Sequence, residues 1–242
     1  MLASPLTQSP LTQTTIAAPT PNRPTDVCVR PATIADLPVL AKIQYEALLP
    51  PLNHCFWDDL LVGTPTDTLA FIAAMLRANA SNWGNGADFW VVEVAGTVLA
   101  GAVGYTPNET DYRPLDLTRL DTIAQHLGWS TVTTQAFLSR YERLWRPNPK
   151  PVFLAPQAPW IIETVAVLPE ARGQGLGKQL LQAVLAEGRS RQHSHAGIRI
   201  VNGNDRAQAI YESLGFKPYQ TFYADYFEEQ FPGMTMLRMR LD

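Results

Sequence analysis

The chain has 242 residues, of which 46% are hydrophobic and 17% charged, with a formal net charge of -3. This length and apolar share are enough for one large domain or two small ones with a hydrophobic core, so we expect a globular protein. No block of Lys or Arg supplies the basic surface that phosphate backbones require, which argues against a nucleic-acid partner.

The sequence also carries no signal for a metal site or for membrane targeting. Cys28 and Cys55 are the only cysteines, they form no CxxC pair and no histidine cluster accompanies them, so we expect neither a disulfide framework nor a metal. No apolar stretch approaches the roughly 20 residues that span a bilayer. The opening MLASPLTQSP lacks the basic and apolar regions of a signal peptide. We therefore expect a cytoplasmic protein that does not associate with membranes.

Residues 1–26 are rich in Thr, Pro, Ser and Ala and have almost no large apolar side chains at regular spacing. Such a segment cannot offset the entropy that it loses on ordering, so we expect a disordered Pro/Thr-rich N-terminal arm. Its prolines would also suit the aromatic groove of a partner. The folded domain is expected over residues 27–242.

The first folded elements are predicted as a strand and two helices. Residues 27–30 have β-type composition, and Thr33 with Asp36 three residues later forms a helix-capping pattern. The Thr-Pro-Thr-Asp segment at 64–67 opens a second helix. Between the helices, residues 50–57 are rich in proline and aromatic side chains and are expected to form a loop.

The middle of the chain is predicted as a hairpin followed by an interruption of the sheet. Residues 89–94 and 98–105 are β-rich runs joined by Ala-Gly-Thr, which favours an antiparallel pair. Residues 106–159 then show apolar side chains at helical spacing in two stretches, one ending at Gly128 and the other before Pro147. We expect a helical insertion here.

The last third of the chain alternates strands and helices. Its predicted elements are a strand at 160–167, a glycine turn, a helix at 175–188, a strand at 197–201, a helix opened by Asn204 and closed by Gly215, and strands at 216–223 and 234–241.

The glycine turn carries the clearest chemical signal. Its sequence places three glycines at alternate positions: Arg172-Gly173-Gln174-Gly175-Leu176-Gly177-Lys178. Without β-carbons the main chain can approach a phosphate closely, and the first N–H groups and the dipole of the following helix favour negative charge. Arg172 and Lys178 can add charge-assisted contacts. The turn therefore predicts a pyrophosphate site.

Two other glycine motifs fit this turn poorly. A Walker loop needs Gly in place of Arg172 and Ser or Thr in place of Gln179. The dinucleotide fingerprint needs its third Gly in place of Lys178, and an acidic residue after the next strand, where none follows. A tight turn with close helix packing explains one or two of the glycines, but not three with flanking cations.

The turn and its surroundings resemble the GNAT (Gcn5-related N-acetyltransferase) superfamily. Residues 165–177, VAVLPEARGQGLG, resemble its acetyl-CoA-binding motif, R/Q-x-x-G-x-G/A. Residues 204–216 are similar to its next motif, a helix opened by Asn with Tyr near its end and a Leu-Gly-Phe exit. Residues 30–33 before Asp36 resemble its usual opening. The resemblance is strong over 160–217 and extends to 27–105.

The resemblance implies an α/β (α+β) GNAT fold, with a mixed, mostly antiparallel central sheet flanked by helices. The insertion at 106–159 departs from the family, whose members commonly join the third and fourth strands by a short connection. We expect this helical insertion between the third and fourth strands to cover the acceptor site as a lid.

The resemblance also implies a binding site for acetyl-CoA as co-substrate. The main chain of Val165 and Val167 would pair with the pantetheine arm, and the side chain of Asn204 would contact the pantetheine end. The Val167 N–H would stabilise the oxyanion. The pyrophosphate would be held by the turn, mainly through the N–H groups of Arg172, Gly173, Gly175 and Gly177, with Gln174, Leu176 and Lys178 completing it.

Two residues are candidates for acid–base chemistry. Tyr211 stands where the family has a tyrosine whose phenol reaches the coenzyme sulfur, although a half-buried aromatic on an apolar helix stripe is the alternative. Glu163 interrupts an apolar strand and, by the two-residue period, shares a face with Val165 and Val167, which suggests the base. An edge-exposed Glu, or a base formed by a water chain, remains the alternative.

The function expected from the resemblance is direct transfer of an acetyl group from acetyl-CoA to a primary amine of a small molecule or peptide. The alternative is a non-catalytic module that binds or senses acyl-CoA. The sequence leaves open the acceptor, the length of the acyl chain and whether the protein is a homodimer.

Overall fold

The computed structural model describes residues 27–109, 111–145, 155–223 and 231–242. The arm expected at residues 1–26 lies outside the described residues. Within them, seven strands form one sheet in the order β1-β2-β3-β4-β5-β7-β6. The strands are β1 (Val27–Pro31), β2 (Phe89–Val94), β3 (Thr97–Tyr105), β4 (Trp160–Val167), β5 (His195–Val201), β6 (Lys217–Phe222) and β7 (Met234–Arg240).

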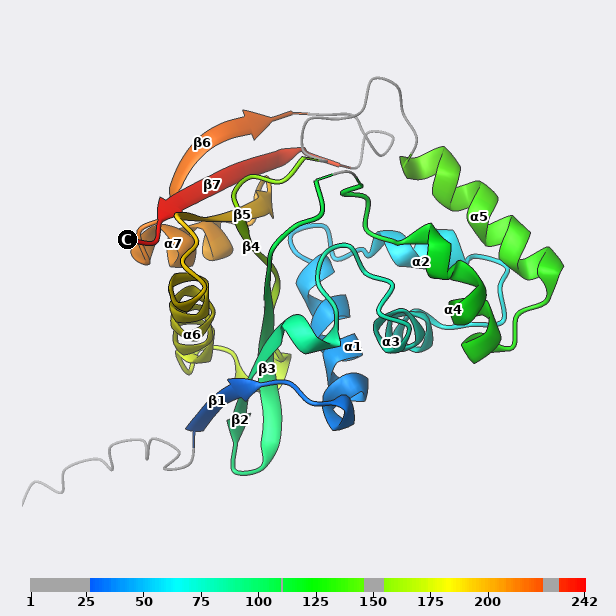
Figure 1. The fold of residues 1–242 in the computed structure, drawn as a ribbon, viewed down its shortest axis with the longest axis horizontal. Coiled ribbons are helices and arrows are strands. Elements are labelled where there is room, and N and C mark those ends of the chain that lie inside the picture. Colours follow the sequence, from blue (N-terminus) through cyan, green and yellow to red (C-terminus); the bar gives the residue numbers. More distant parts are fainter. Residues whose placement is uncertain (1–26, 110, 146–154, 224–230) are drawn as a thin grey trace, which may run out of the picture.

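The sheet is mostly antiparallel, with one parallel pair at its centre. Only β4 and β5 run parallel, and they pair at just two positions, Trp160 with Ala196 and Ile161 with Gly197. Beyond Ile161 the two strands separate, and the sheet divides into β1 to β4 and β5 to β7 (Figure 1). The predicted mixed, mostly antiparallel sheet is confirmed.

Helices cover both faces of this sheet (Figure 1). The α-helices are α1 (Leu37–Leu48), α2 (Phe56–Leu61), α3 (Thr68–Arg77), α4 (Leu120–Leu127), α5 (Thr131–Trp145), α6 (Leu176–Ser190) and α7 (Asp205–Ser213). Short 3₁₀ helices span Ile34–Asp36, Gly86–Asp88, Leu117–Arg119 and Pro169–Ala171. Among the described residues, no helix is long and apolar enough to cross a membrane.

The two faces have separate hydrophobic cores. On one face, α1 buries Leu40 and Ile43 in a cluster that also includes residues of α2 to α5. On the other face, α6 buries Leu180, Leu181 and Val184, and Tyr211 of α7 joins the same cluster. The apolar stripes that predict these helices are the stripes that the structure buries.

The predicted helical insertion lies between β3 and β4, and its helices α4 and α5 pack beside α2 and α3 (Figure 1). Its side chains belong to the core: Phe137 and Tyr141 are fully buried. The predicted loop at 50–57 ends in helix α2, because Phe56 and Trp57 pack against aromatic rings of α3 and α5, an interaction that local sequence does not reveal.

Candidate active site

A groove of about 540 Å³ opens where β4 and β5 separate. Its walls come from α1, the far ends of β4 and β5, the glycine turn and α7. Every predicted site residue except Gln174 lines this groove, and Gln174 is exposed on the same turn. The end away from the turn is bounded by Gln44, Leu48, Pro50, Trp57, Trp83 and Met234.

The glycine turn holds a left-handed backbone at two of its three glycines. Gly173 has a φ of 83° and Gly175 a φ of 80°, values that residues other than glycine rarely adopt. A β-carbon at either position would meet nothing within 4 Å, so backbone conformation rather than crowding requires glycine there. Gly177 has no positive φ, and a β-carbon would lie 3.4 Å from Val167 Cγ2.

The main-chain N–H groups of this turn are available to a ligand. Among the described residues, the N–H groups of 173–177 have no hydrogen-bond partner. They precede and open α6, whose dipole places partial positive charge at the same point. The N–H of Arg172 differs, since it donates to the Pro169 carbonyl at 3.4 Å. The geometry suits a phosphate or pyrophosphate.

The Arg172 side chain connects the turn to two neighbouring elements. Its Nε donates to the Val167 carbonyl at 3.0 Å, and its guanidinium lies 2.7 Å from Glu46 Oε2 on α1. The Arg172 side chain is 41% exposed. The guanidinium thus bridges β4 and α1.

The end of β4 presents its main chain to the groove. The Leu168 N–H donates to the Leu99 carbonyl at 2.9 Å. In an antiparallel ladder, hydrogen-bonded residue pairs alternate with pairs that are not hydrogen-bonded. Leu168 is bonded to Leu99, so the next pair, Val167 with Ala100, is not. The N–H and C=O of Val167 therefore point away from β3, toward the edge of β4 from which β5 has separated. By the same alternation Val165 also faces that edge.

A β-bulge in β4 changes the direction of Glu163. Thr164 has φ of 55°, and the register with β3 shifts between Gly101 and Val103. Val165 and Val167 therefore pack on the α6 face, whereas Glu163 faces the α1 side together with Arg199. The prediction that Glu163 shares a face with Val165 and Val167 is wrong, because the extra residue of the bulge interrupts the two-residue period.

Glu163 forms a buried ion pair with Arg199 of β5. Their side chains lie 2.8 Å apart and are 13% and 2% exposed. The Arg199 guanidinium also lies 4.2 Å from the centre of the Trp83 ring. Burial raises the pKa of Glu163, while the charge and hydrogen bond of Arg199 oppose this rise. Arg199 is not among the residues predicted from the sequence, although it interrupts an apolar strand just as Glu163 does.

Tyr211 and Asn204 bring α7 to the same groove. Tyr211 is buried, and among the described residues its hydroxyl has no hydrogen-bond partner. Burial, and then the negative charge of Glu163, raise the pKa of this phenol, which therefore stays protonated at neutral pH. Asn204 caps α7, with its Oδ1 accepting from the Ala207 N–H at 3.3 Å.

No group of three or more His, Cys, Asp or Glu residues in the described part of the chain could hold a metal ion. Glu163 and Tyr211, the two predicted acid–base candidates, both line the groove together with the glycine turn.

Comparison with known proteins points to one family. The model of the acetyltransferase (GNAT) family matches residues 137–216, which run from α5 to the end of α7. No curated protein matches the chain.

Solved structures share the fold. An N-acetyltransferase from Staphylococcus aureus Mu50 is 20% identical, with a TM-score of 0.56 over 88% of this chain and 100% of its own. The structure of yncA from Salmonella typhimurium, solved with its cofactor acetyl-CoA, is also 20% identical, with a TM-score of 0.51 over 90% of this chain and 95% of its own. A third acetyltransferase structure is 17% identical, with a TM-score of 0.54 over 89% and 100%. Residues 137–216 thus match the GNAT acetyltransferase family, and the chain shares the fold of these acetyltransferase structures.

Proposed function

We propose that the protein transfers an acetyl group from acetyl-CoA directly to a primary amine of a small molecule or peptide. The observation that carries this proposal is the run of unpaired N–H groups at 173–177, which opens onto a groove that also contains Glu163 and Tyr211. GNAT acetyltransferases use acetyl-CoA, and the turn offers the main-chain donors that its pyrophosphate needs.

The residues present fit acetyl-CoA, which would supply the activated acetyl thioester. The N–H groups of Gly173, Gly175 and Gly177 would hold its pyrophosphate. A ligand can approach the first two closely, because a β-carbon at Gly173 or Gly175 would meet no atom within 4 Å. The main chain of Val165 and Val167 would receive the pantetheine arm as an added strand, since β5 has left that edge of β4 open. The side-chain amide of Asn204 would contact the same arm.

Two side chains would move the protons. An attacking amine must be neutral, and we assign Glu163 as the group that accepts its proton, because the raised pKa of this carboxyl brings it closer to neutral pH. Tyr211 would donate its phenolic proton to the departing sulfur. The Val167 N–H, which faces the open edge, would stabilise the negative charge that develops on the carbonyl oxygen.

The test combines binding and turnover. Calorimetry should show acetyl-CoA binding, and pooled primary amines should release coenzyme A, with the acetylated product identified by mass spectrometry. Glu163→Gln should lower kcat about 10²- to 10⁴-fold, the range of general acid–base catalysis. Glu93→Gln is the matched control, since Glu93 pairs with Arg30 away from the groove and should leave kcat unchanged. A full-length chain that binds no acetyl-CoA would refute the proposal.

One observation favours a second function, an acyl-CoA-binding module without catalysis. The Glu163 carboxylate is already engaged by Arg199, and such a pair can serve structure alone. This candidate predicts acetyl-CoA binding without turnover for every amine tested. Tyr211→Phe would then change nothing except the stability of the protein.

The lid role of the insertion is a separate prediction. The described helices α4 and α5 form part of the core beside α2 and α3, whereas residues 146–154 lie outside the described residues. A cytoplasmic location and a homodimer also remain predictions.

A further inference from the structure

The insertion between β3 and β4 brings a buried phenol to the acid–base pair. Tyr112 is fully buried, and its hydroxyl lies 3.5 Å from Glu163 Oε1, at the long limit of a hydrogen bond. The same hydroxyl lies 3.1 Å from that of Tyr105 on β3. Glu163, Tyr112 and Tyr105, which come from three separate segments, therefore form a row of polar groups that ends at a carboxylate lining the groove.

Tyr112 also contacts the partner of Glu163. The Arg199 guanidinium lies 5.1 Å from the centre of the Tyr112 ring and 4.2 Å from that of Trp83. Trp83 Nε1 donates to the Tyr112 carbonyl at 2.8 Å, which fixes the two rings relative to each other. Aromatic faces attract a guanidinium most strongly where it is desolvated, and the Arg199 side chain is only 2% exposed. The two rings therefore hold Arg199 against Glu163.

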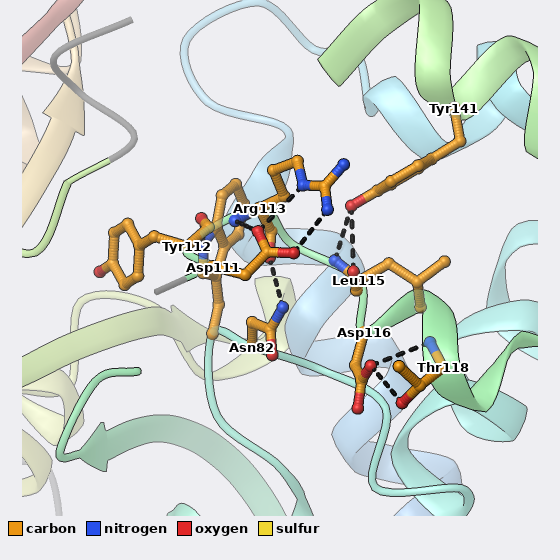
Figure 2. Close-up of polar contacts among 9 residues, drawn as sticks. Asn82, Asp111, Tyr112, Arg113, Leu115, Asp116, Thr118 and Tyr141 are labelled. Atoms are coloured by element: carbon orange, nitrogen blue, oxygen red, sulfur yellow. Dashed lines mark hydrogen bonds and ion pairs between the residues drawn. The ribbon is translucent and has the colours of Figure 1, made fainter. Parts of the chain in front are cut away.

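The main chain on the far side of Tyr112 is anchored by Tyr141 of the insertion and by Asn82, which precedes β2 (Figure 2). The Tyr141 hydroxyl of α5 accepts from the Leu115 N–H at 2.9 Å and donates to the Leu115 carbonyl at 3.3 Å. Asn82 donates to the Arg113 carbonyl at 3.0 Å. In Figure 2 the Tyr112 ring points away from these contacts. Its direction is thus set by hydrogen bonds of the surrounding loop.

We propose that Tyr112 is a positioning residue of the acid–base centre, which holds the Glu163 carboxylate and the Arg199 guanidinium in the orientation that the reaction needs. The insertion then contributes to the chemistry, in addition to any role as a cover. This inference rests on the proposed function, in which Glu163 accepts the proton of the amine.

The expected signature is a change in the titration of Glu163. In the described part of the chain, four titratable or charged groups face this carboxylate: Arg199 from β5, Tyr112 from the insertion, Tyr105 from β3 and Tyr211 from α7. A hydroxyl that donates to a carboxylate stabilises its charged form and lowers its pKa. Loss of the Tyr112 hydroxyl should therefore raise the pKa of Glu163, and the acid limb of the kcat/KM profile should move to higher pH.

The experiment compares two hydroxyl deletions in the full-length chain. Tyr112→Phe should move the acid limb upward by about half a pH unit or more, measured with acetyl-CoA and the amine that the wild-type chain acetylates fastest in the pooled screen. Tyr45→Phe removes another phenol that donates to a carboxylate, that of Asp58 at 3.2 Å outside the groove, so it should leave the limb in place.

A second measurement needs no turnover. Carboxyl carbon-13 NMR of the chain labelled at Glu, with the Glu163 signal assigned through Glu163→Gln, reports the same pKa directly in the absence of acetyl-CoA. Arg199→Lys, which keeps the charge and loses the planar contact with the rings, should shift this pKa in the same direction as Tyr112→Phe. If Tyr112→Phe does not fold, the Glu163 titration in Arg199→Lys still shows whether the contact of Arg199 with the rings of Tyr112 and Trp83 orients the pair.

The outcomes separate the two proposals. An unchanged Glu163 titration in both variants, with normal acetyl-CoA binding and turnover, would overturn the role of Tyr112 and leave the proposed function standing. Absence of turnover with every amine, together with a shifted Glu163 titration, would reject the catalytic function and keep the positioning role as a property of the pair.

Discussion

The two ends of the groove are built in different ways. The proposed phosphate end uses consecutive residues, 172–178, with free main-chain N–H groups and two glycines with positive φ. The proposed acid–base end uses side chains from four elements that are distant in sequence: Glu163 on β4, Arg199 on β5, Tyr112 in the insertion and Tyr211 on α7.

This difference determines how each end responds to mutation. A main-chain site changes when the backbone conformation changes, and it is largely indifferent to the neighbouring side chains. A buried side-chain centre changes whenever one member is lost, because each remaining polar group then lacks a partner in a largely buried position. Substitutions at the two ends should therefore differ in what they disturb and by how much.

Removal of the buried cation should have the largest effect. Arg199→Met leaves Glu163 as a buried carboxylate without its ion-pair partner, and we expect the free energy of unfolding at pH 8 to fall by about 3–5 kcal/mol. Urea denaturation followed by circular dichroism measures this change. The double variant Glu163→Leu with Arg199→Met is the control, and it should recover most of the loss because no charge is left unpaired. A loss below about 1 kcal/mol in the single variant would show that the pair is effectively hydrated.

Removal of the candidate acid should affect turnover and leave binding intact. Tyr211→Phe should lower kcat about 100-fold, equivalent to about 2.7 kcal/mol of transition-state stabilisation. The acetyl-CoA Kd, measured by calorimetry, should stay within about twofold, because the hydroxyl has no partner among the described residues to lose. Tyr219→Phe, at an exposed position of β6, is the control for loss of a phenol. Equal kcat in both variants would contradict the role of Tyr211.

The glycines of the turn allow a matched comparison. Gly175→Ala forces a side chain into a backbone with φ of 80°, which should cost about 1–2 kcal/mol and weaken acetyl-CoA binding roughly tenfold. Gly177→Ala adds the same methyl group without a positive φ, at van der Waals distance from Val167, and should bind nearly as well as the wild type. Equal affinities for the two variants would show that the turn adapts, contrary to a rigid main-chain site.

The difference between a local main-chain site and a site built from distant side chains also explains which features could be predicted from the sequence. The order of strands and helices follows from apolar periodicity and capping residues, and the phosphate turn from the spacing of its glycines, because both are local properties. The direction of Glu163 could not be predicted, since the two-residue period assumes a regular strand and nothing in the sequence indicates a positive φ at Thr164. The contact between Tyr112 and Glu163 depends on how the insertion packs, which the chain reveals only when it is folded.

The smallest effect should come from an ion pair of equal length in a different environment. Arg172 lies 2.7 Å from Glu46, about as close as Arg199 lies to Glu163, but the side chains of this pair are 41% and 23% exposed. Water therefore solvates each charge when its partner is removed, and Arg172→Met should change the free energy of unfolding by at most about 1 kcal/mol. Acetyl-CoA affinity should also fall less in this variant than in Gly175→Ala, if main-chain N–H groups hold the pyrophosphate. A calorimetric loss of affinity larger than that of Gly175→Ala would instead assign the phosphate to the Arg172 guanidinium, and the two ends of the groove would then both depend on side chains.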